Sequence, residues 1–70
     1  MTAEPQNQDE KALLAGLARP AQRALVAAGI RNLEQLATFS EAEIGQLHGI
    51  GPNAIAQLRR SLRARGLSFA

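Results

Sequence analysis

A glycine-rich stretch in the second half of the chain has the spacing of an anion-binding turn. It reads Leu47-His48-Gly49-Ile50-Gly51-Pro52-Asn53-Ala54-Ile55. Because glycine adopts positive φ at little steric cost, Gly49 and Gly51 predict a tight turn around Ile50, and Gly51 is expected to disfavour a Cβ. Pro52 is typical of a first helical position, where the missing N–H is not needed. The stretch therefore predicts a helix whose first backbone N–H groups face outward and can receive a phosphate.

Arginine side chains are distributed around this stretch in two groups. Seven of the eight basic residues are arginine, which suits bidentate contact with phosphate better than lysine does. The first basic group consists of Lys11, Arg19, Arg23 and Arg31. An acidic stretch follows it, with Glu34, Glu41 and Glu43. The second basic group comes after the glycine turn and consists of Arg59, Arg60, Arg63 and Arg65. Arg63 and Arg65 fit best as cations at a helix C-terminus. Asn53 and Arg60 suit a nucleic-acid contact and an ordinary surface position equally well.

The chain resembles a known family along this same stretch. Ile44-Gly45-Gln46-Leu47-His48-Gly49-Ile50-Gly51, followed by Ala54, Ile55 and Leu58, looks like a helix-hairpin-helix motif. Within that family the segment from Leu17 to Phe69 is most similar to the C-terminal domain of the bacterial RNA polymerase alpha subunit, including its closing segment Leu62–Phe69. The resemblance implies a compact all-α bundle of five short helices with tandem helix-hairpin-helix (SAM-like) character. It also implies contact with the minor groove of double-stranded DNA.

The resemblance points to particular residues for that contact. The family's main DNA-contacting arginine falls near Pro20, with Arg19 just before it, and Arg23 aligns with a polar contact residue. The family's lysine and serine contacts align with Asn53 and Ala54, which removes one charge and one hydroxyl, so contact with the DNA backbone is expected rather than promoter recognition. The candidate nucleic-acid-binding residues are Arg19, Arg23, Gly49, Ile50, Gly51, Asn53, Ala54, Gln57 and Arg60.

Helix signals divide the chain into five elements after a disordered tail over 1–8. Helices are expected over 9–18, 20–28, 33–37, 41–47 and 52–65, together forming one domain over 9–70. Gly29 and Gly66 are predicted to end two of them, with Ile30 and Leu67 folding back in Schellman motifs. Asn32 and Ser40 are the predicted N-caps, Ser40 within a capping box.

The buried faces follow from the spacing of apolar residues. They are expected to be Leu13, Leu14 and Leu17; Ala24, Leu25 and Ala28; and Ile55, Leu58 and Leu62. A weak internal repeat relates the segment from Leu25 to Leu36, through Gly29-Ile30, to the segment from Leu47 to Leu58, through Gly49-Ile50. Two such halves are expected to form one folding unit.

Composition restricts the remaining classes of function. Seventy residues allow one small domain, and 46% hydrophobic residues with two Phe and no Trp or Tyr predict an aliphatic core. Without cysteine, and with His48 as the single histidine, we expect no metal site, no cofactor and no enzyme. No membrane segment is expected, and we predict a cytoplasmic bacterial monomer that binds double-stranded DNA. The alternative is a protein-interaction module associated with the transcription machinery, which Glu34, Glu41 and Glu43 would suit.

Overall fold

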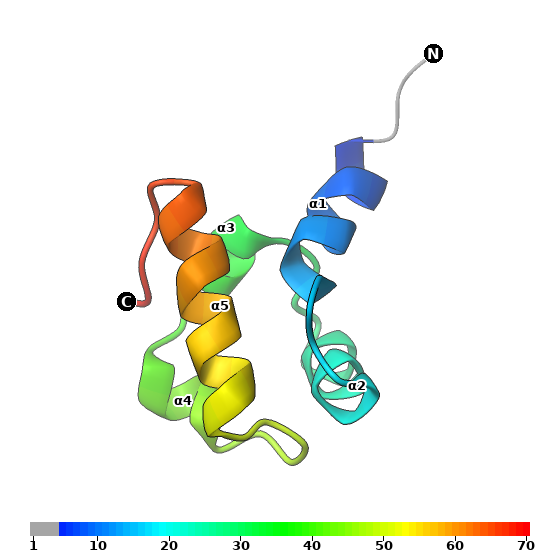
Figure 1. The fold of residues 1–70 in the computed structure, drawn as a ribbon, viewed down its shortest axis with the longest axis vertical. Helices are drawn as coiled ribbons and strands as arrows, with labels where there is room; N and C mark the ends of the chain where they lie inside the picture. Colours follow the sequence, from blue (N-terminus) through cyan, green and yellow to red (C-terminus); the bar gives the residue numbers. More distant parts are fainter. Residues whose placement is uncertain (1–4) are drawn as a thin grey trace.

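The fold is all-α, as the sequence predicts. The computed structural model describes residues 5–70, and within them the only regular elements are helices. In chain order they are α1 (Pro5–Leu14), α2 (Arg19–Ala27), α3 (Leu33–Leu36), α4 (Glu41–Gly45) and α5 (Pro52–Ala64) (Figure 1). The longest, α5, packs against α4 and α1, and α1 also packs against α3.

The core is aliphatic and draws on every helix. Its buried side chains are Leu13, Leu17, Ala21, Leu25, Ile30, Leu33, Leu36, Ile44, Leu58 and Leu62. Phe39 and Phe69 are half-buried at its edge, and the backbone N–H of Ala70 donates to the carbonyl of Phe39 at 2.9 Å. Leu14 and Ile55, both expected inside, are half-buried. Since leucine and isoleucine supply most of this interior, apolar burial is the main interaction that holds the helices together.

The first helix begins and ends earlier than predicted. It starts at Pro5, so residues 5–8, expected in the tail, are helical, and residues 1–4 lie outside the described part of the chain. It ends at Leu14 because Gly16 adopts a φ of +78°, a left-handed conformation that stops a helix. The sequence predicts the break at Pro20, whereas the structure places it at Gly16. Leu17 is still buried, but from the loop after the helix.

The second helix is held by its buried side chains and by hydrogen bonds to the segment before it. Ala21 and Leu25 are its buried residues, whereas Ala28, expected inside, is exposed beyond the helix end. The side-chain amide of Gln22 donates to the carbonyl of Leu17 at 2.9 Å and to that of Leu14 at 3.4 Å. Leu14 is the last residue of α1 and Leu17 lies in the loop that follows, so these bonds tie α2 back to the end of α1 and to that loop.

Two helices end in the Schellman motif that the sequence predicts. Gly29 has a φ of +80°, and the N–H of Ile30 donates to the carbonyl of Leu25 at 3.0 Å. The same arrangement closes α5: Gly66 has a φ of +73°, and the N–H of Leu67 donates to the carbonyl of Leu62 at 2.8 Å. Ile30 is buried, whereas Leu67 is half-buried against the core.

The two short helices carry the predicted N-caps. Asn32 Oδ1 accepts from the N–H of Gln35 at 2.7 Å, and Gln35 Oε1 accepts in return from the N–H of Arg31 at 2.7 Å. Ser40 and Glu43 form a complete capping box, with bonds of 3.0 and 2.8 Å. Because a helix of four or five residues cannot persist by itself, these caps and the burial of Leu36 and Ile44 fix α3 and α4.

Truncation to alanine should reduce stability more at Ile30 than at Leu67, the two residues that follow the glycine caps. Ile30→Ala should lower the free energy of unfolding by about 2–4 kcal/mol, because it empties a fully buried position. Leu67→Ala should cost about 1–2 kcal/mol, because that side chain is half-buried. Urea unfolding followed by circular dichroism measures both; equal losses would contradict this difference in burial.

Candidate functional site

The loop between α4 and α5 lies directly against the first turn of α2. Gly49 has a φ of +101°, and a Cβ added to it would lie 2.6 Å from the carbonyl oxygen of Pro20. Carbon and oxygen atoms cannot approach so closely, so only glycine allows this contact. The loop and the start of α2, far apart in sequence, are therefore held side by side (Figure 1).

Gly51 does not need the conformational freedom that its sequence context suggests. Its φ of −117° and ψ of −176° are extended backbone, and no atom lies within 4 Å of an added Cβ. The expectation that Gly51 disfavours a side chain is wrong. The turn needs its left-handed residue at Gly49, whereas Gly51 is the N-cap of α5, from which Pro52 starts the helix.

Two of the predicted arginines come together beside this loop. Arg19 and Arg23, one turn apart on α2, line a shallow depression of about 410 Å³ with His48 and Gly49. We call it the arginine depression; its other lining residues are Pro20, Ala24 and Ala27. Its charged lining residues are two arginines and it contains no acidic residue, so the depression suits an anion.

A second depression adjoins the first at Gly49. This glycine depression, of about 290 Å³, lies between the α1–α2 loop and the start of α5. It is lined by Gly16, Leu17, Ala18, Ala21, Gly49, Gly51, Pro52, Asn53 and Ala54. Because six of these nine residues are glycine or alanine, a ligand there can approach the backbone closely.

The helices that begin at these depressions lack the side-chain caps found on α3 and α4. Their N-caps are Ala18 for α2 and Gly51 for α5, neither of which has a side-chain oxygen. The first N–H groups of a helix have no acceptor within it, so those of Asn53 and Ala54 are available beside the glycine depression.

Three predicted site residues take other positions. Ile50 is half-buried and packs on the core, so only its backbone can reach a ligand. Gln57 is half-buried beside Gly16: a Cβ added to Gly16 would lie 3.1 Å from Cδ of Gln57. Its Oε1 accepts from Arg60 at 3.1 Å. Gln57 thus positions Arg60, which is exposed two turns along α5 from Asn53 and lines neither depression.

The acidic residues of α4 are engaged within the fold. Glu41 Oε2 accepts from an Arg59 guanidinium nitrogen at 2.6 Å, and this hydrogen bond, followed by charge attraction, raises the pKa of Arg59. Glu43 accepts from the N–H of Ser40 in the capping box. Arg59 is therefore directed to α4, and no carboxylate lines the arginine depression.

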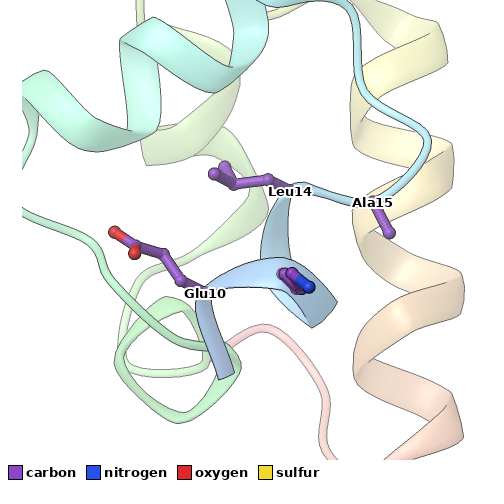
Figure 2. Close-up of a pocket in the computed structure, with 4 residues that line it drawn as sticks. Glu10, Leu14 and Ala15 are labelled. Atoms are coloured by element: carbon purple, nitrogen blue, oxygen red, sulfur yellow. The ribbon is translucent and has the colours of Figure 1, made fainter. Parts of the chain in front are cut away.

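A further depression on α1 lacks these features. It measures about 440 Å³ and is lined by Glu10, Lys11, Leu14 and Ala15. Figure 2 shows Glu10 and Leu14 extending from the same side of α1, with Ala15 extending away from them. Since all four residues belong to one short segment and carry both signs of charge, this is a groove beside a helix rather than a converging site.

The sequence admits a phosphate contact for His48 as an exposed turn residue, but the predicted site residues do not include it, and they also lack the loop residues Gly16 and Ala18. His48 directly precedes the glycine at the centre of the site, which is a signal that could have included it. Gly16 and Ala18 carry no such signal, because only the packing of the α1–α2 loop on α5 brings them there.

Structure and comparison define the class only as a small all-α domain. No family model, curated protein or solved structure matches the chain. Within residues 5–70, no helix has the length and apolarity to cross a bilayer, and no three metal-ligating side chains gather as a metal site.

Alanine at the two loop glycines should have opposite consequences. Gly49→Ala should lower the free energy of unfolding by at least about 2 kcal/mol, because it combines a left-handed φ with a backbone clash. Gly51→Ala should change it by less than about 1 kcal/mol, since its conformation is open to any residue. Thermal and urea unfolding test the pair; a tolerated Gly49→Ala would refute the close approach to Pro20.

Proposed function

We propose that this chain is a helix-hairpin-helix domain, similar to the C-terminal domain of the bacterial RNA polymerase alpha subunit, that binds double-stranded DNA. It acts as a monomer in the cytoplasm, by binding alone and without a catalytic step. The observation that carries the proposal is the meeting of Arg19 and Arg23 with the uncapped start of α5 across Gly49.

Each part of this surface suits a different contact with the DNA backbone. Guanidinium groups bind phosphate oxygens in pairs, which suits Arg19 and Arg23. The free N–H groups of Asn53 and Ala54, at the positive end of the α5 dipole, take a phosphate through the glycine depression. Arg60 lies about 10 Å further along the helix axis, within reach of a neighbouring phosphate.

The same residues favour binding without sequence preference. Phosphate contacts fix the position of a protein on a duplex, whereas contacts with base edges select the sequence. Pro20, Asn53 and Ala54 occupy positions where the similar polymerase domain has an arginine, a lysine and a serine. The remaining groups, arginines and backbone N–H groups, are those that recognise the phosphate chain.

Duplex binding should be weak and strongly dependent on salt. Contact with about three phosphates gives a Kd on the order of 10⁻⁴–10⁻⁶ M at physiological salt and a log–log salt slope near −2.7. Binding should then weaken about 40-fold between 50 and 200 mM salt. Fluorescence anisotropy with a short duplex measures both, and NMR amide shifts should centre on 19–23 and 48–54.

A charge-matched pair of double variants identifies the surface. Arg19→Gln with Arg23→Gln should reduce the slope by about 1.8 and the affinity at 50 mM salt by more than tenfold. Arg31→Gln with Arg63→Gln removes the same charge near the opposite ends of α2 and α5, and should have a much smaller effect. Equal losses would mean that net charge alone attracts DNA. If wild type gives no shifts even at low salt, the DNA proposal fails and a protein-interaction module replaces it.

A further inference from the structure

We propose that His48 is a titratable cation of the DNA-binding surface, the third in the arginine depression after Arg19 and Arg23, so that duplex affinity rises as the pH falls from 8 to 5.5. This inference rests on the proposed function and adds a regulation that the arginines cannot provide. Arginine keeps its charge throughout this range, whereas histidine is the side chain that ordinarily gains a proton within it.

The position of His48 carries the inference. His48 is exposed in the α4–α5 loop, yet it lines the arginine depression together with Arg19 and Arg23 of α2. The contact of Gly49 with Pro20 fixes the loop against α2. A phosphate bound by Arg19 and Arg23 would therefore lie beside the imidazole ring as well.

The charged groups around the ring leave it free for this role. From α2, the charged residues that share its depression are Arg19 and Arg23. Its own loop carries no other charge, and the start of α5 has none before Arg59. On α4, Glu41 pairs with Arg59 and Glu43 accepts from Ser40. The neighbour that favours a protonated ring is thus the bound phosphate itself.

Protonation of His48 and binding of the duplex should strengthen each other. A duplex phosphate attracts the protonated imidazole more strongly than the neutral one, so proton uptake accompanies binding. By linkage, lower pH strengthens binding and higher pH weakens it. If the protonated ring neutralises one further phosphate, the salt slope steepens by about 0.9 and affinity at 50 mM salt rises about tenfold.

The test measures duplex affinity by anisotropy at pH 5.5 and pH 8.0 in 50 mM salt. Wild type should bind about tenfold tighter at pH 5.5, with the steeper salt slope. In His48→Gln the ratio of the two affinities should fall to about one, because the side chain cannot gain a proton. In His48→Arg the ratio should also be about one, because the charge is permanent. Circular dichroism melts at both pH values check that each variant is folded.

Three results would separate the inference from the proposed function. Duplex binding of equal strength at both pH values would overturn the role of His48 and leave DNA binding intact. A His48→Gln variant that keeps the wild-type ratio would assign the pH effect to another group and also overturn the role of His48. Absence of binding at both pH values would overturn the proposed function itself.

Discussion

The contact between Gly49 and the carbonyl of Pro20 is the constraint on which the arrangement depends. It joins the loop before α5 to the first turn of α2, so the depressions on either side share one backbone wall. Buried aliphatic side chains, mainly leucine and isoleucine, hold all five helices together through apolar area, and such contacts tolerate small shifts. The close contact of Gly49 with the carbonyl of Pro20 does not tolerate such shifts. It therefore fixes the relative position of Arg19 and Asn53 more closely than the core alone does.

The sequence predicts local structure correctly where a few adjacent residues determine it. Gly29 and Gly66, each followed by an apolar residue, end their helices as predicted because the Schellman motif is closed within six residues. Ser40 and Asn32 are N-caps for the same reason. The all-α fold follows from these signals together with the apolar spacing.

The sequence is a poorer guide to features that depend on contacts between residues distant in the chain. The sequence shows two glycines around Ile50, but only the approach of α2 makes Gly49 the indispensable one and leaves Gly51 replaceable. Gln57 has the helical position of a surface residue, yet the turn at Gly16 brings a loop against it. Helix periodicity describes one element at a time, so it contains no information about which loop arrives on which face.

The hydrogen bond from Ala70 to Phe39 has a practical consequence for handling the protein. It fastens the last residue beside the α3–α4 loop, on the side of α5 away from α1 and α2 (Figure 1). A fluorophore or sensor-chip linker attached at Ala70 would therefore project from the side of α5 away from α2 and the arginine depression. Immobilisation through that end leaves the arginine depression open to solution, whereas a bulky label near α2 would obstruct it.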